Sequence, residues 1–229
     1  MKVAILQSNY IPWKGYFELI NDCDVFCFYD EVQYTKNDWR NRNKILGKNG
    51  DFWLTIPITK DSVKKKISEV ELIDSSWQAR HLKSIEQSYV KSPFKEEVLS
   101  LIRPIYLDRT WTSLSELNQF LIKEICSFIG ITTQFKESKN FTLDGGKVDR
   151  LINLIVQLEG TVYLSGPSAR NYLAGSESLF LDKKIELQYK EYGPYLKYLN
   201  HETESVSILD VLMNVNKSEV LSYITSLKK

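Results

Sequence analysis

Polar and aromatic side chains suited to ligand recognition cluster between residues 7 and 16, directly after a short apolar run. The run 3–6 has the composition of a buried strand, and residues 16, 19 and 20 have helical spacing. Gln7 and Asn9 alternate outward from the strand end and offer amides to a base or a sugar, whereas Gly15 lets backbone approach a ligand closely. The alternative is a structural turn tied by its own amides. The residues of this turn predicted to bind substrate are Gln7, Asn9, Tyr10, Trp13, Lys14, Gly15 and Tyr16.

A second polar block, residues 30–44, follows the apolar run 24–29. A carboxylate at a strand end, such as Asp30, can hold a sugar ammonium or accept its proton, so Asp30 is a predicted catalytic residue. The alternative is an ion pair between Asp30 and Arg40 or Arg42. The local excess of cations favours a phosphorylated small molecule. The block's predicted substrate-binding residues are Gln33, Tyr34, Asp38, Arg40, Asn41, Arg42 and Lys44.

A Ser-Gly-Pro-Ser turn at residues 165–168 separates an apolar run from the next helical pattern. A helix N-terminus carries unpaired N–H groups and a partial positive charge, which favour an anion. The turn therefore predicts a phosphate site made of Ser165, Gly166, Ser168 and Arg170. The alternative is a simple helix cap, with Pro167 in the first turn.

His81 is the histidine with an organised setting, because it shares a helical face with Trp77, Ile85 and Tyr89. If this face lines a cleft, His81 is a general base for an attacking amine or hydroxyl. If the face is buried, His81 is a packing residue. The other histidine, His201, lies in a polar loop and is interpreted as incidental.

Familiar cofactor and metal motifs are missing from the sequence. We find no HExxH, no cysteine pairs with metal-ligand spacing, no Walker loop and no GxGxxG fingerprint. No cofactor or metal is therefore assigned. Cys23, Cys27 and Cys126 are interpreted as reduced, buried thiols.

The pattern of elements predicts an α/β fold with a Rossmann-like core built from βαβ units. Apolar runs at 3–6, 24–29, 52–58, 67–73, 131–135, 161–164 and 185–189 predict strands. Helical patterns cover 76–89, 95–102, 114–129, 147–158, 169–173, 207–213 and 218–226. We expect one domain over 1–229, with an α/β core at about 1–75 and 131–229 and a helical insertion at about 76–130. Ligands of such folds bind at the carboxyl ends of the strands.

Bulk composition narrows the class of protein. The formal net charge is +1, which gives no global basic field for nucleic acid. No apolar run reaches the roughly 18–20 residues of a membrane span, and no leader peptide is visible. We expect a cytoplasmic protein with no membrane partner; the sequence specifies no oligomeric state.

Several segments together resemble the WbqC-like family: Gln7-Ser-Asn-Tyr-Ile-Pro-Trp-Lys-Gly-Tyr-Phe, the block 30–43, Trp53-Leu-Thr-Ile-Pro, Tyr163-Leu-Ser-Gly and Ser207-Ile-Leu-Asp-Val-Leu. The resemblance implies a role in bacterial O-antigen, lipopolysaccharide or capsule synthesis. It suggests a transferase that modifies a nucleotide-linked (dTDP- or UDP-) amino sugar, by N-acyl or aminoacyl (for example glycyl) transfer to the sugar amine. The partners it implies are the nucleotide sugar and an acyl or aminoacyl donor, with a charged tRNA among the candidates.

The order of strand, Pro12-Trp-Lys-Gly-Tyr16 and helix is also similar in layout to the HxGH nucleotidylyltransferases, as is the later segment Leu164–Arg170. Trp13 and Tyr16 stand where that layout has its two histidines, which stabilise charge on the transferring phosphate. Binding a nucleoside diphosphate without breaking it fits such a replacement. Two alternatives remain: a nucleotidyltransferase-like enzyme, and a non-catalytic sugar-nucleotide binding protein of the same pathway.

Overall fold

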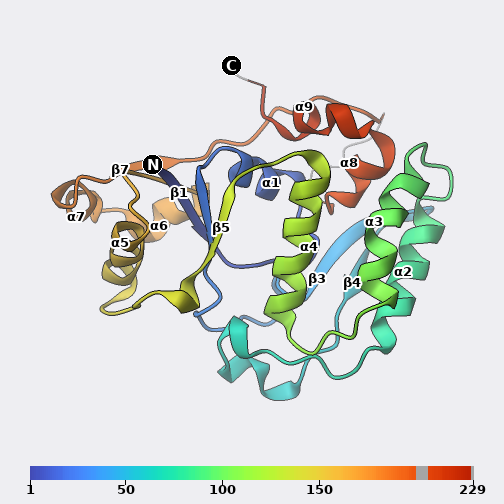
Figure 1. Ribbon diagram of the computed structural model, residues 1–229, viewed down its shortest axis with the longest axis horizontal. Coiled ribbons are helices and arrows are strands. Elements are labelled where there is room, and N and C mark those ends of the chain that lie inside the picture. The colour runs from blue at the N-terminus through green and yellow to red at the C-terminus, as the bar shows by residue number, and fades with distance from the viewer. Residues whose placement is uncertain (200–205, 228–229) are drawn as a thin grey trace.

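A five-stranded parallel sheet forms the centre of the protein, whose computed structural model describes residues 1–199 and 206–227 (Figure 1). The strand order is β5-β2-β1-β6-β7. The strands are β1 (Lys2–Leu6), β2 (Val25–Phe28), β5 (Gln134–Glu137), β6 (Val162–Ser165) and β7 (Glu186–Tyr189). The expected α/β fold with a Rossmann-like core is confirmed. His201 lies outside the described residues.

Both faces of the sheet are covered, because the side chains of β1 and β2 alternate between two apolar cores. Val3 and Ile5 pack toward α5 (Lys147–Gln157), α6 (Arg170–Leu173) and α7 (Glu177–Asp182). Ala4 and Phe26 face the other way, toward α1 (Lys14–Asn21) and α4 (Leu114–Ile129). The two layers are visible on opposite sides of the strands in Figure 1.

The strand order reverses direction at β1. From β1 the chain builds outward through β2 and β5, then returns to place β6 and β7 on the other side of β1. In such sheets the crevice outside the carboxyl ends of the two strands at the reversal is the preferred ligand site. Here those ends are Leu6 and Ser165.

Further elements extend the core on the α4 side of the sheet. The antiparallel hairpin of β3 (Arg42–Gly47) and β4 (Gly50–Thr55) lies beyond α4 with α2 (Ser76–Ser88), α3 (Lys95–Leu107) and α8 (Leu209–Asn214), whereas α9 (Val220–Ile224) packs against α1 (Figure 1). Helices α2 and α8 both pack against β3. The expected division into an α/β core and an insertion at 76–130 stays a prediction.

Two local expectations in this region were wrong. The strand β3 was not predicted, because the polar residues Arg42, Asn43 and Lys44 at its start are typical of a loop. The expected strand at 67–73 is instead a 3₁₀ turn, Ile67–Glu69, followed by isolated bridges. The Glu69 carboxylate accepts from the backbone N–H of Lys66 at 3.0 Å, which stabilises the turn against an extended ladder.

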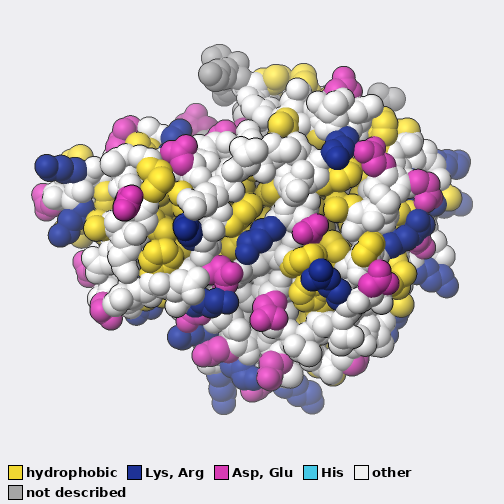
Figure 2. Space-filling model, viewed as in Figure 1, with side chains coloured by type: hydrophobic (Ala, Val, Ile, Leu, Met, Phe, Trp, Pro, Cys, Tyr) yellow, Lys and Arg dark blue, Asp and Glu magenta, His cyan; other side chains and the backbone are white. Residues whose placement is uncertain are grey.

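No helix in the described part of the chain is both long and apolar enough to cross a membrane. On the face shown in Figure 2, acidic and basic side chains are interspersed, in keeping with the net charge of +1.

Candidate functional site

A cavity of about 880 Å³ lies where the strand order reverses, and we call it the switch-point cavity. Its walls come from the ends of β1 and β6, the segment after β2 and the N-terminal end of α5. A volume of this size is typical of small-molecule sites. Its polar, aromatic and glycine lining residues are Gln7, Trp13, Tyr29, Gln33, Gly145, Gly146, Lys147, Arg150, Tyr163, Ser165, Gly166, Ser168, Tyr172 and Tyr192.

The charge in this lining is entirely positive. Lys147 and Arg150 come from the first turn of α5, directly after Gly145 and Gly146, and no aspartate or glutamate lines the cavity. Among the described residues, neither cation forms an ion pair with a carboxylate. The Lys147 ammonium lies 4.0 Å from the centre of the Tyr172 ring. Cations without carboxylate partners beside a helix N-terminus favour an anionic ligand.

Arg150 lies close to the phenol of Tyr29. Burial raises the pKa of Tyr29, and the nearby guanidinium of Arg150 acts in the opposite sense. Within the described part of the chain, the buried Nε of Arg150 has no hydrogen-bond partner. Because Arg150 lines the cavity, the other N–H groups of its guanidinium are the donors for a ligand oxygen.

An aromatic wall adjoins the cations. The rings of Trp13 and Tyr192 lie 5.0 Å apart, centre to centre, at an interplanar angle of 64°. Both rings line the cavity, and Trp13 is partly exposed. Such rings offer flat apolar area to a base or a sugar ring.

Six of the predicted binding residues line the switch-point cavity: Gln7, Trp13, Gln33, Ser165, Gly166 and Ser168. The Ser165 hydroxyl donates to the Tyr163 hydroxyl at 3.2 Å, and the Gln33 amide donates to the Val63 carbonyl at 2.9 Å.

Arg40 lies behind this lining and fixes part of it. Its guanidinium donates to Gln7 Oε1 at 3.2 Å and to the side-chain oxygen of Asn9, and it lies 3.6 Å from the Asp38 carboxylate. The first turn and the second polar block therefore meet, as expected. Their contact orients the amide of Gln7; Asn9, Asp38 and Arg40 do not line the cavity themselves.

Several predicted binding residues are buried in packing instead. Their polar atoms bind other parts of the protein: the Tyr16 hydroxyl donates to the Gln7 carbonyl at 2.9 Å, and the Tyr34 hydroxyl donates to Asn41 Oδ1 at 2.8 Å. The Lys14 ammonium lies 4.1 Å from the centre of the Tyr195 ring. These contacts hold the first turn and the second polar block in place, and the side chains do not face the cavity. The residues concerned are Tyr10, Lys14, Tyr16, Tyr34 and Asn41.

Gly15 does not leave space for a ligand. A Cβ atom at this position would lie 2.4 Å from the indole of Trp13, so the glycine makes room for that ring. The expected close approach of ligand to the Gly15 backbone is thus corrected to a packing role.

The predicted cluster of phosphate-binding cations is dispersed. Arg170 is exposed and turns toward Glu191, 3.7 Å away, and toward the Tyr189 ring. Arg42 lies over the Trp53 ring at 4.3 Å on the hairpin, where Lys44 pairs with Asp51 at 2.8 Å. None of the three cations lines the switch-point cavity.

His81 is buried, and it lines neither the switch-point cavity nor the second cavity described below. Its Nδ1 lies 2.8 Å from the Tyr10 hydroxyl, and its ring contacts Trp77 edge-on at 5.1 Å. Burial lowers the pKa of His81 to about 4, which leaves a weak base. The geometry is that of the packing alternative, and it gives no support to His81 as a general base.

Asp30 faces a different hollow, a cavity of about 350 Å³ that we call the α4 cavity because five lining residues belong to α4. Its carboxylate accepts from the Ser8 backbone N–H at 2.8 Å, from Ser115 Oγ at 2.5 Å and from Gln119 Nε2 at 2.9 Å. Among the described residues it pairs with neither Arg40 nor Arg42. Asp30 is therefore separated from the predicted phosphate-binding residues.

The residues that the sequence failed to indicate are Lys147, Arg150, Tyr29, Tyr172 and Tyr192. A signal for two of them exists: Gly145-Gly146 precedes a helix that carries Lys147 and Arg150 one turn apart. The same helix-terminus argument that selected the turn at Ser165 applies to this segment.

Comparison with known proteins shows the family of the chain. A family model, the WbqC-like protein family, matches residues 7–221. The chain belongs to the WbqC-like family. A relative of this WbqC-like protein, the uncharacterized protein Rv1507c of Mycobacterium tuberculosis (strain ATCC 25618 / H37Rv), is 42% identical over 218 residues, 93% of this chain and 94% of the relative. No solved structure matches the chain. The family match contains every residue of the switch-point cavity except Ile5 and Leu6.

Proposed function

We propose that this WbqC-like protein is a transferase that binds a nucleotide-linked (dTDP- or UDP-) amino sugar in the switch-point cavity. The proposal rests on one observation. Lys147 and Arg150 line a cavity that has an aromatic wall and no carboxylate among its lining residues. A diphosphate matches the cations and a nucleobase matches the aromatic rings.

The roles follow from the position of each group. Lys147 and Arg150 contact the diphosphate, and Ser168 and the turn at Gly166, which line the same cavity, add hydrogen bonds. Trp13 and Tyr192 stack on a ring of the ligand. The amides of Gln7 and Gln33 provide hydrogen bonds that select polar edges.

The proposed reaction is N-acyl or aminoacyl transfer to the sugar amine. The amine lone pair forms a C–N bond with the acyl carbon, and the bond between that carbon and the donor's leaving group breaks. The leaving group (a thiol sulfur or a ribose oxygen) departs with the electron pair and takes up the proton that the amine loses. The lining of the switch-point cavity contains neither a carboxylate nor an imidazole. We therefore assign binding residues and no general base.

Because the lining offers binding groups but neither a carboxylate nor an imidazole, it also favours a second candidate function. This candidate is a non-catalytic sugar-nucleotide binding protein of the same pathway. The third candidate, a nucleotidyltransferase-like enzyme, draws on the reversal of strand order at β1 and on the layout of the first turn. It requires a triphosphate and a divalent metal, and it releases pyrophosphate.

One assay separates the candidates. The protein is incubated with dTDP- and UDP-linked amino sugars and either acyl-coenzyme A or aminoacyl-tRNA, and the sugar nucleotide is analysed by mass spectrometry. A mass gain equal to the acyl group supports transfer. Binding by calorimetry without a mass gain for any donor supports the non-catalytic candidate. Pyrophosphate release from a triphosphate and a sugar phosphate supports nucleotidyl transfer, and absence of all three signals contradicts the proposal.

A further inference from the structure

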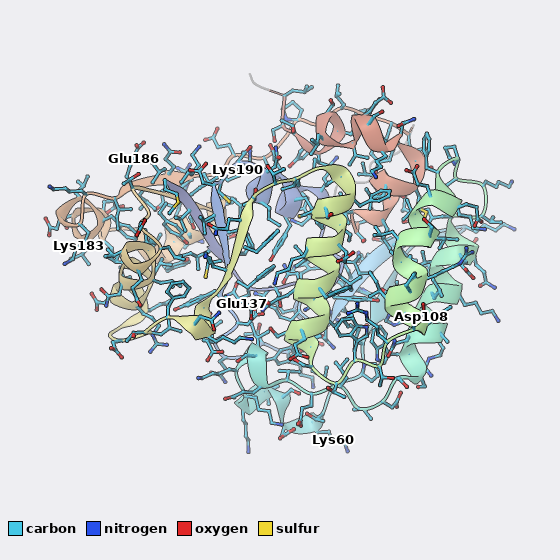
Figure 3. The ribbon with its side chains drawn as sticks, viewed as in Figure 1. Lys60, Asp108, Glu137, Lys183, Glu186 and Lys190 are labelled. Carbon is cyan, nitrogen blue, oxygen red and sulfur yellow. The ribbon has the colours of Figure 1, made fainter. Side chains whose placement is uncertain are left out.

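The α4 cavity opens on the face of the sheet opposite to the switch-point cavity. Phe28 and Asp30 line the α4 cavity, whereas Tyr29 lines the switch-point cavity, so successive residues at the end of β2 serve the two hollows. Figure 3 shows Glu137, another lining residue, at the carboxyl end of β5 beside α4. At about 350 Å³ the α4 cavity is at the small end of ligand sites.

The deep part of this cavity carries a negative charge without a cationic partner. Asp30 is 3% exposed, and its three hydrogen bonds come from the neutral donors Ser8, Ser115 and Gln119. No ion pair joins Asp30 to a lysine or an arginine in the part of the chain that the structure describes. A carboxylate has about four acceptor positions, so at least one remains for a ligand donor. A buried charge is costly unless it is paired, which favours a ligand that brings a positive group.

Most other charges around the cavity neutralise one another. Glu137 lies 2.7 Å from the Lys139 ammonium and 3.7 Å from that of Lys123, and Glu31 lies 2.9 Å from that of Lys66. Glu116 is exposed at the rim.

Arg109 is the exception among the cations of the rim. Its guanidinium lies 4.2 Å from the centre of the Phe120 ring and 5.8 Å from that of Trp111, and it has no carboxylate partner among residues 1–199 and 206–227. On the face shown in Figure 2, basic side chains lie beside hydrophobic ones over α4 and β5. Stacking leaves the planar edge of a guanidinium free to bind a carboxylate through two hydrogen bonds.

We propose that the α4 cavity binds a small zwitterion of the amino acid class. The ligand ammonium contacts the Asp30 carboxylate, and the ligand carboxylate contacts Arg109. The two protein charges that lack partners have opposite signs, so one molecule with both groups satisfies them together. The site is distinct from the phosphate-binding cavity, and it does not depend on the function proposed there.

Nuclear magnetic resonance tests the site directly. The indole N–H of Trp111 donates to the Ile105 carbonyl at 2.9 Å, and its ring lines the cavity. The indole N–H signal is recorded in the ¹⁵N-labelled full chain and is assigned by its loss in Trp111→Phe. Each proteinogenic amino acid is then added to a final concentration of about 10 mM, which is high enough to detect weak binding. For the amino acid that binds best, the decarboxylated amine and the deaminated acid are titrated in the same way.

The expected result is saturable movement of the Trp111 signal with the zwitterion, and at least about tenfold weaker binding of both single-charge analogues, since each lacks one charged hydrogen bond. Arg109→Gln weakens binding by about the same factor. Lys183→Gln, directly after α7 and far from the α4 cavity (Figure 3), leaves binding unchanged. No movement with any amino acid, equal binding of the analogues, or wild-type affinity in folded Arg109→Gln overturns the proposal.

Discussion

The backbone N–H of Ser8 donates to Asp30 Oδ1 at 2.8 Å, which joins the chain just after β1 to the chain just after β2. The other carboxylate oxygen binds Ser115 and Gln119 of α4. Asp30 thus fixes the turn that presents Gln7 to the switch-point cavity, while its own carboxylate lines the α4 cavity. One buried side chain positions parts of both cavities.

Replacing Asp30 by asparagine is expected to destabilise the fold. The new amide keeps one acceptor oxygen, but its NH₂ group faces donors that the carboxylate had accepted. A buried donor left without a partner costs about 1–3 kcal/mol. The free energy of unfolding in urea measures this loss, with exposed Asp182→Asn on α7 as the control. Equal stability of Asp30→Asn and wild type contradicts the positioning role.

Gly15→Ala is expected to displace the Trp13 ring. The added Cβ would lie 2.4 Å from the indole, and overpacking of this kind costs about 1–3 kcal/mol. Both the free energy of unfolding and the tryptophan fluorescence report the change. Gly166→Ala is the matched control: nothing lies within 4 Å of its Cβ position, and its φ of −67° suits any residue. Similar effects in the two variants argue against a packing role specific to Gly15.

The buried His81 predicts a pH dependence of stability. Burial lowers its pKa to about 4, against about 6.5 in an unfolded chain. Between these values the unfolded chain binds more protons, so the contribution of His81 is fully present above about pH 6.5 and is lost as the pH falls toward 4. At 1.36 kcal/mol per pKa unit, the total loss is about 3 kcal/mol.

His81→Gln tests this titration, because glutamine takes up no proton in that range. The variant is less stable near neutral pH, yet its free energy of unfolding falls less steeply from pH 6.5 to 4 than that of the wild type. Denaturant titrations at several pH values give the two curves. Parallel curves would mean that His81 does not titrate as its burial requires.

The sequence predicted best where a local rule decides the structure. The helix at Leu114–Ile129 was placed to the residue, since Ser113 caps its start and Gly130, at a φ of 84°, ends it. The first βαβ unit was equally clear from its apolar spacing. The hairpin strand β3 was hidden because its first three residues, Arg42, Asn43 and Lys44, are all polar, which removes the apolar alternation of a half-buried strand.

The site was predictable in part, for a related reason. Gln7 and Ser165 each lie at the carboxyl end of a parallel strand, where ligands of such folds bind, and both line the cavity. Arg150 enters the cavity from a helix far along the chain, and Arg170, which shares its chemistry, turns outward to Glu191. Which cation faces the cavity depends on tertiary packing, which periodicity does not report.

The contrast between Arg150 and Arg170 tests the central claim most directly. Calorimetry measures the affinity of dTDP and UDP for the wild type, Arg150→Ala and Arg170→Ala. Loss of a charged hydrogen bond to phosphate weakens binding about tenfold or more in Arg150→Ala. Arg170→Ala, whose side chain is paired outside the cavity, is expected to bind like the wild type. Unchanged affinity in Arg150→Ala with weaker binding in Arg170→Ala, or no binding of either nucleotide to the wild type, would contradict a phosphate site in the switch-point cavity.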